Sequence, residues 1–214
     1  MASKRNIFEE VGSDTKITSA SAGAIARAGS GDRHWVRLWL WSLVGLIIVM
    51  ITVGGLTRLT DSGLSITEWD PVMGAIPPLS AAAWQAAFAA YQTTAEFAVQ
   101  NSAMSLAEFK VIFWWEWGHR QLGRFIGLTW ALGFALLFFT GKLPKARRLS
   151  LFAIGPFIGL QGFIGWLMVH SGLDGVRLDV ASYWLMAHLG AAFALLGYIY
   201  WSLQIFSRSA AELL

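Results

Sequence analysis

The residues most capable of chemistry gather in one short stretch, "WWEWGHRQLGR", which contains Glu116, His119, Arg120 and Arg124. A further histidine, His188, lies in "YWLMAHLG". Imidazole nitrogens bind transition metals, a carboxylate can accept a proton, and guanidinium groups bind anions. These residue types together suggest a metal or cofactor site, provided that the fold brings them together.

The elements that must position these residues are membrane helices. The 214-residue chain is 56% hydrophobic and only 14% charged, with a mean hydropathy of +0.53, which is unlike a soluble domain. A helix needs about 20 apolar residues to cross a bilayer. The sequence predicts an all-α membrane protein, a bundle of four transmembrane helices within a domain at 35–208. The helices are expected at about 36–56, 106–140, 149–170 and 181–206.

The remaining segments are expected to be a mobile cytoplasmic tail at 1–34, a C-terminal tail at 209–214 and a long loop at 57–104 on the outer side. Within this loop, "SAAAWQAAFAAYQ" predicts an amphipathic helix capped by Ser80, with Trp84, Phe88 and Tyr91 on one face. This face could rest on the membrane surface or on the outer mouth of the bundle. The absence of cysteine excludes disulfides and thiolate ligands.

Positive charge predicts the orientation. Lysine and arginine precede the first helix, crowd the link between the second and third helices, and follow the fourth: Arg33, Arg37, Lys142, Lys145, Arg147, Arg148 and Arg208. The other two loops dilute their basic residues with seven acidic ones: Asp61, Glu68, Asp70, Glu96, Glu108, Asp174 and Asp179. Because positive residues favour the cytoplasmic side, both termini are expected in the cytoplasm.

The polar residues of the opening stretch share one face of the predicted second helix. At about 100° per residue, Glu116, His119, Arg120 and Arg124 fall on the same side as Gly123. Polar groups inside a membrane usually face protein, and glycines allow a neighbour or a flat ligand to approach closely. The competing interpretation is a structural Glu–Arg pair that holds helices together.

The histidines favour a ligand pair. His119 and His188 each lie eight residues past the points, near Val111 and Val180, where two parallel helices are expected to enter the membrane, about 12 Å deep at the α-helical rise. A lone intramembrane histidine is usually a packing residue, but a depth-matched pair favours two axial ligands. His34 and His170 lie near helix ends, where an interfacial position is the default expectation.

The residue types narrow the choice of metal. A di-iron bundle needs two Glu-x-x-His motifs and two further glutamates, whereas Glu116 is the only carboxylate expected deep within a span. A zinc site would require a third protein ligand. Two histidines, glycines and aromatic residues suit haem iron, and Arg58, Arg120 or Arg124 could pair with haem propionates.

Several motifs in order resemble one family. "GGLTRLTDSGLS", "PPLSAAAWQAAFAAYQ", "MSLAEFK", "EWGHRQLGR", "LQGFIGWLMVHSGL" and "YWLMAHLG" cover about residues 54–206, and together they resemble the haem A synthase family of cytochrome oxidase assembly. This family has two four-helix halves, and the chain is similar to the N-terminal one.

The resemblance implies that haem O is the substrate, bound between His119 and His188, and that Glu116 serves the oxidation of a ring methyl to a formyl group. It places a haem b in the C-terminal half, through which the electrons would leave. It also implies a bacterial inner (cell) membrane location. The expected partners are the lipid bilayer, haem O, haem O synthase, and a C-terminal half or another copy of the chain; no nucleic acid is expected.

Two other classes of function stay open on the sequence. One is a bis-His cytochrome b-type subunit, in which haem is a fixed electron carrier. The other is a non-catalytic assembly or structural membrane protein, in which His and Arg side chains hold helices together. The identity of the bound haem would discriminate between these classes.

Overall fold

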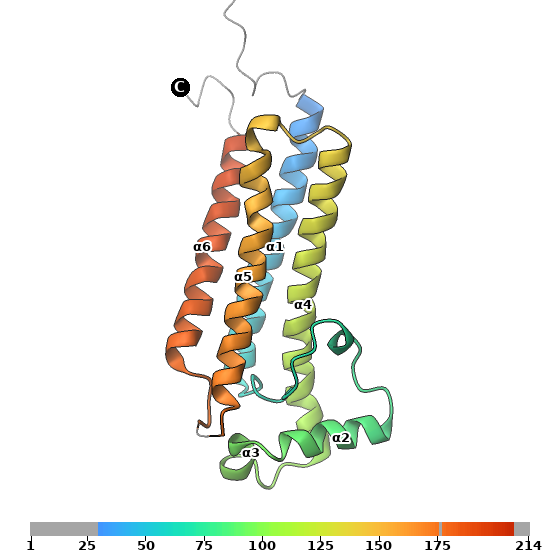
Figure 1. The fold of residues 1–214 in the computed structure, drawn as a ribbon, viewed down its shortest axis with the longest axis vertical. Coiled ribbons are helices and arrows are strands. Elements are labelled where there is room, and N and C mark those ends of the chain that lie inside the picture. The colour runs from blue at the N-terminus through green and yellow to red at the C-terminus, as the bar shows by residue number, and fades with distance from the viewer. Residues whose placement is uncertain (1–29, 176, 208–214) are drawn as a thin grey trace, which may run out of the picture.

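The computed structural model describes residues 30–175 and 177–207. Four long helices lie side by side (Figure 1): α1, Ser30–Leu59; α4, Leu106–Phe139; α5, Arg148–Gly172; and α6, Ser182–Ser207. The short helices are η1, Met73–Ala75; α2, Ala81–Tyr91; α3, Ala95–Val99; and η2, Lys145–Arg147. The described residues contain no β-strand, so the predicted all-α, four-helix fold is confirmed.

The four long helices are long and apolar enough to cross a membrane, and the protein is therefore a multi-pass membrane protein. Their bounds differ from the expected ones mainly at α1, which begins at Ser30, inside the segment expected to be a tail, and continues to Leu59. The rest of that expected tail, residues 1–29, lies outside the described residues, as does the C-terminal tail.

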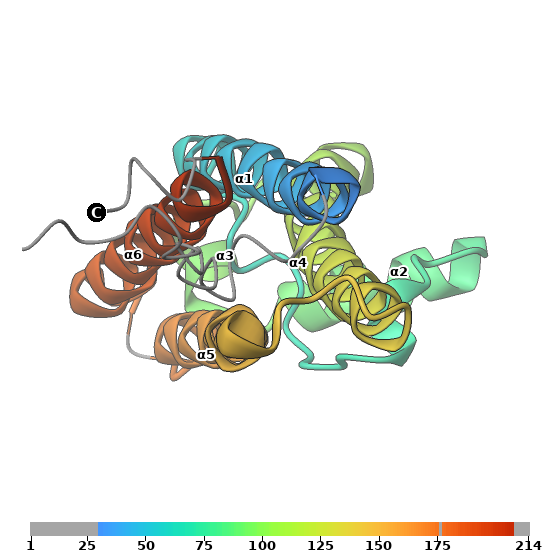
Figure 2. The same ribbon diagram turned by 90° about the horizontal axis from the view of Figure 1, so that it is seen from above.

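The helices form a ring in which α1 packs against α4 and α6, and α5 packs against the same two helices. Figure 2 shows this arrangement along the bundle, with α4 and α6 diagonal to each other. Side chains carried by α4 and α6 can therefore face each other across the centre of the bundle.

An apolar core fills one half of the bundle, at the end where α1 begins and α6 ends. Its fully buried members include Leu40 and Leu43 of α1, Ile154 of α5, and Ile199 and Leu203 of α6. We call this the closed half. Close helix contacts there depend on small residues, because a Cβ added at Gly133 or Gly155 would lie 2.2 Å from the indole of Trp39 or Trp130, respectively.

The other half carries the connection at 60–105 and the loop between α5 and α6, and we call it the loop-bearing half (Figure 1). Helix α4 has 34 residues, about 51 Å at the α-helical rise, so its first turns extend beyond a hydrocarbon core of about 30 Å. Ser105 and Glu108 form a capping box at its start.

Helix α2 packs on this extension of α4. The ring centroid of Trp84 lies 4.9 Å from that of Phe113, and the rings of Phe88 and Tyr91 lie 5.0 and 5.4 Å from that of Phe109. The aromatic face of α2 therefore rests on protein at the mouth of the bundle, which was one of the two positions that the sequence left open. Ser80 caps α2 through the backbone N–H of Ala83.

Candidate functional site

A cavity of about 380 Å³ lies between the four long helices in the loop-bearing half. It is large enough for an organic ligand, since such sites typically measure roughly 300–1,000 Å³. Its walls come from all four helices and from the segment after α1. All six residues that the sequence proposed for the site line this one cavity: Arg58, Glu116, His119, Arg120, Arg124 and His188.

His119 and His188 reach this cavity from the diagonal helices α4 and α6. Each ring lies against a glycine of a neighbouring helix. A Cβ at Gly54 of α1 would come within 3.2 Å of His119 Nε2, and a Cβ at Gly165 of α5 within 3.1 Å of His188 Cε1. These glycines leave room for the two imidazoles, which face the same space from opposite sides.

The other two histidines lie elsewhere. His170 is exposed near the end of α5 and stacks on Trp166, with ring centroids 5.8 Å apart. His34 is exposed near the beginning of α1. Neither residue lines the cavity. Among the described residues, no group of three or more His, Asp or Glu side chains is arranged to hold a metal ion.

Glu116 is buried, with 2% exposure, and four donors hold its carboxylate. Arg120 donates to Oε1 from Nη2 at 2.5 Å and from Nε at 3.1 Å. Ser65 Oγ and the backbone N–H of Ile66 donate to Oε2, each at 2.7 Å. Because a carboxylate offers about four lone-pair sites, its acceptor capacity is filled. A Glu–Arg pair is thus present, but it lies within α4 and does not join two helices; both of its residues line the cavity.

The two arginines of α4 fasten the segment 66–75 to the helix. Arg120 donates to the carbonyl oxygens of Ile66 and Glu68, at 2.9 and 3.2 Å. Arg124 donates to the carbonyl oxygens of Asp70 and Pro71, at 3.1 and 3.0 Å. Between them, Gln121 donates to Ala75 O at 2.7 Å. We call this segment the strap. Its irregular backbone lies beside a membrane helix, where side-chain donors must satisfy its carbonyl groups.

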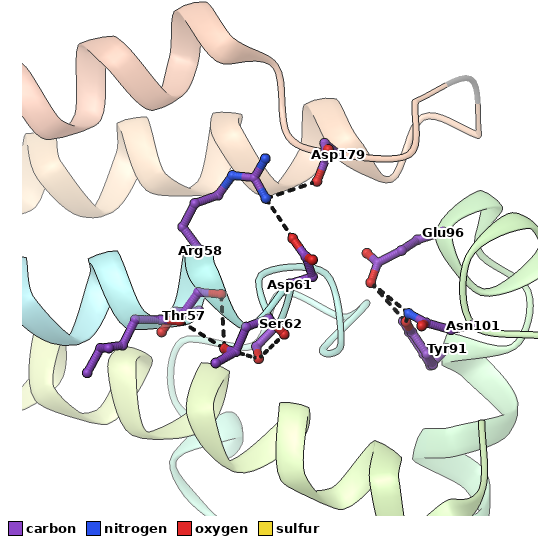
Figure 3. Close-up of polar contacts among 10 residues, drawn as sticks. Thr57, Arg58, Asp61, Ser62, Tyr91, Glu96, Asn101 and Asp179 are labelled. Atoms are coloured by element: carbon purple, nitrogen blue, oxygen red, sulfur yellow. Dashed lines mark hydrogen bonds and ion pairs between the residues drawn. The ribbon is translucent and has the colours of Figure 1, made fainter.

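Arg58 stands at the mouth of the cavity, at the end of α1 (Figure 3). Its Nη1 lies 2.7 Å from Asp61 Oδ1 and 3.3 Å from Asp179 Oδ1, so it joins the turn after α1 to the loop before α6. Its side chain is 44% exposed. Asp61 adopts a positive φ of 47° to make this turn. Arg58 is therefore the most accessible of the three candidate arginines.

A second buried carboxyl, Glu96 of α3, also lines the cavity, close to this mouth (Figure 3). Tyr91 Oη donates to its Oε1 at 2.9 Å, and Asn101 Nδ2 lies 3.4 Å from the same oxygen. Burial, followed by repulsion from Glu116 and Asp179, raises the pKa of Glu96 to about 7. Burial also raises the pKa of Tyr91.

Sequence reasoning did not single out Glu96, Ser65 or Gln161. Gln161 was visible as the one amide within "FIGLQGFIGW", a polar side chain in a predicted span. Glu96 and Ser65 carried no such signal, because both lie in a polar loop where carboxylate and hydroxyl groups are ordinary. Only the folded loop brings Glu96 to the cavity and Ser65 to the carboxylate of Glu116.

Comparisons with known proteins point to one family. Residues 37–212 match the family described as COX15-CtaA, cytochrome oxidase assembly protein. The heme A synthase of Dinoroseobacter shibae is 55% identical over all of this chain and 56% of its own length. Those of Roseobacter denitrificans and Paracoccus denitrificans are 52% and 50% identical, over 100% and 99% of this chain and 57% and 56% of their own lengths.

The chain thus spans about half the length of the curated relatives that it matches. No solved structure matches it. The family match covers most of the chain, including every residue that lines the cavity, and the relatives align with almost all of it. The chain belongs to the COX15-CtaA family of cytochrome oxidase assembly proteins.

Proposed function

We propose that this chain forms the substrate-binding half of a haem A synthase, which oxidises a ring methyl of haem O to a formyl group for cytochrome oxidase. The observation that carries the proposal is the position of His119 and His188, which face one cavity from diagonal helices. The relatives named heme A synthase support the activity, and haem b is expected in a C-terminal half.

The residues present fit a haem. The two imidazoles would hold the iron, and Gly54 and Gly165 keep the space beside them open. Apolar side chains such as Ile47, Met50 and Ile158 line the remaining wall, which suits the macrocycle and the apolar tail of haem O. When bound, haem O supplies the methyl carbon that is oxidised, and its iron supplies the coordination site for the histidines.

Arg58 is the arginine best placed to hold a propionate. It is half exposed at the mouth, and an incoming carboxylate could replace Asp61 or Asp179 as its partner. Arg120 and Arg124 already donate to Glu116 and to the strap. They would therefore add positive charge to the cavity wall, while their N–H groups stay hydrogen-bonded to Glu116 and to the strap.

Glu116 would serve the chemistry as a fixed negative charge. Its four donors leave little acceptor capacity for a further proton, so the geometry favours stabilisation of positive charge that develops on the oxidised carbon. To act as a general base at the cavity, Glu116 would first have to lose one of these donors.

The test is haem binding by histidine variants of the detergent-solubilised protein. We expect His119→Ala and His188→Ala to abolish haem binding or to weaken it sharply, whereas His170→Ala, the matched control, keeps it. Equal haem content in all three variants would contradict the ligand assignment. Extraction and identification of the haem from cells that make haem O separates the functions: haem O or A supports the synthase, stoichiometric haem b a cytochrome, and no haem a structural protein.

We further propose a bacterial inner-membrane location with both termini in the cytoplasm. Described basic residues at the end of the closed half support this orientation: Arg33, Arg37, Lys142, Lys145, Arg147 and Arg148. The chain lacks cysteine, so single cysteines can be introduced cleanly. Cysteines at Ala82 and Ala146 should react with an impermeant maleimide from opposite sides of the membrane, and labelling from the same side would refute the topology. Haem O synthase and a C-terminal half or second copy remain the proposed partners.

A further inference from the structure

Two buried polar atoms beside the cavity lack a hydrogen-bond partner, and they belong to neighbouring side chains. Among the described residues, Gln161 Oε1 and His188 Nδ1 are both buried without a partner. A buried polar atom without a partner costs roughly 1–3 kcal/mol, so each such atom requires an explanation. Both residues line the cavity, Gln161 from α5 and His188 from α6.

The two residues are already in contact. Gln161 Nε2 donates to the backbone carbonyl oxygen of His188 at 3.2 Å, which fixes the amide beside this turn of α6. Gly165, one turn further along α5, lies under the His188 ring, where an added Cβ would be 3.6 Å from Nδ1. One face of α5 therefore supplies both the surface that the imidazole rests on and an amide next to it.

We propose that Gln161 is a positioning residue for His188: its side-chain carbonyl accepts the Nδ1–H of the imidazole when Nε2 binds iron. A neutral imidazole carries one ring proton, and a partner at Nδ1 places that proton there and leaves the Nε2 lone pair for the metal. Metal-bound histidines commonly donate their other N–H to a carbonyl or carboxylate group, which fixes the ring and strengthens the ligand. One bond would satisfy both unpartnered atoms.

This inference rests on the proposed haem site, and its test reports on the ligand rather than on activity. The probe is haemin, titrated into the detergent-solubilised 214-residue chain, with haem affinity and reduction potential as the readouts. Gln161→Met removes the acceptor at similar volume, and we expect about tenfold to a hundredfold weaker binding and a higher reduction potential. Gln161→Glu restores an acceptor, so it should recover affinity and lower the potential relative to Gln161→Met.

The matched control is Gln204→Met, since Gln204 is a half-buried amide of α6 in the closed half. It should change neither readout. Unchanged affinity and potential in Gln161→Met would overturn the inference, and so would equal losses in the Met and Glu variants, because a purely structural role predicts no recovery by Glu. If His188→Ala binds haemin like the unmodified protein, the proposed ligand pair itself is wrong. The two failures are therefore distinguishable.

Discussion

The two halves of the bundle are held together by different forces. In the closed half, α1, α5 and α6 meet through interlocking apolar side chains such as Leu40, Ile154 and Ile199. In the loop-bearing half, the centre is a cavity, and polar bonds join the wall to the chain around it. Apolar packing fixes the helix ends at one side, whereas hydrogen bonds define an open space at the other.

This difference shows how a membrane bundle can keep a site from collapsing. Apolar side chains such as Ile47 and Ile158 form part of the cavity wall, but they have no directional requirement and tend to pack to high density, so they do not by themselves keep it open. Glu116 and Arg120 fix the distance between α4 and the strap by directional bonds to the backbone of Ile66. Gly54 and Gly165 remove volume beside the histidines. The cavity thus stays open because polar bonds hold its wall in place and because the two glycines have no side chains to fill the space.

The substitution Glu116→Gln is the strongest test of whether polar bonds stabilise the loop-bearing half. Glutamine cannot accept from Arg120 on one side and from both Ser65 and Ile66 on the other, so a buried cation or amide loses its partner. We expect a loss of about 3–5 kcal/mol, localised to the loop-bearing half. Thermal unfolding in detergent, combined with hydrogen exchange, should show faster opening of the strap while the closed half stays protected.

Two further variants separate the roles of Glu116. Ser65→Ala removes one donor without leaving a charge unpaired, so it should cost only about 1 kcal/mol. The double variant Glu116→Gln/Arg120→Gln should be less destabilised than the sum of its parts, and strict additivity would contradict a coupled pair. In a protein completed by a C-terminal half, a Glu116→Gln variant that binds haem but accumulates haem O supports the chemical role, whereas normal haem A production would defeat it.

A smaller effect should follow from pH, and only in the loop-bearing half. Because burial raises the pKa of Glu96 from 4.5 to about 7, the folded protein holds this proton more tightly than the unfolded chain does. The resulting stability is fully present below about pH 4.5 and is lost as the pH rises through 7, by on the order of 2–3 kcal/mol.

Glu96→Gln should remove this slope, because glutamine stays neutral across the range and can still accept from Tyr91. The difference in thermal midpoint between the unmodified protein and this variant should therefore grow from pH 4.5 to pH 8, in favour of the variant. Glu68→Gln, which changes an exposed carboxylate of the same connection, is the control. A difference that does not vary with pH would show that Glu96 ionises in the folded protein as it does in water.

Much of this architecture was accessible from the sequence, for a physical reason. A bilayer requires about 20 apolar residues per crossing, so α1, α4, α5 and α6 can be recognised in the sequence as long apolar segments. The three-residue interval between Glu116 and His119 places both on one helical face, so their shared cavity also followed. Burying a polar residue in a membrane span costs free energy, so the few polar residues in these spans were recognisable as candidates for function.

The strap could not be predicted in the same way. Its contacts join residues separated by about fifty positions, such as Ile66 with Glu116 and Ile66 with Arg120, and no periodicity links them. The sequence therefore suggested that Arg120 and Arg124 were available to a ligand, whereas the fold gives their donors to backbone carbonyl groups. The local sequence pattern indicates which face of a helix a residue occupies, but the conformation of the connecting loop determines which groups that residue contacts.

The smallest change in stability is expected for Arg58→Gln. This variant tests whether the mouth of the cavity, unlike the strap, depends little on polar bonds for its stability. The ion pairs of Arg58 with Asp61 and Asp179 are about half exposed, so their loss should cost only about 0–1 kcal/mol. Haem affinity should nevertheless fall by about tenfold or more if a propionate takes the place of these carboxylates, since bonds between guanidinium and carboxylate groups contribute roughly 1.5–3 kcal/mol. Arg177→Gln is the matched control, because Arg177 pairs with Asp174 at 3.7 Å with similar exposure but does not line the cavity. Haemin titration and thermal unfolding should be measured for both variants. Equal haem affinities would show that Arg58 does not bind the propionate. A large loss of stability in Arg58→Gln alone would show that polar bonds stabilise the mouth as they do the strap.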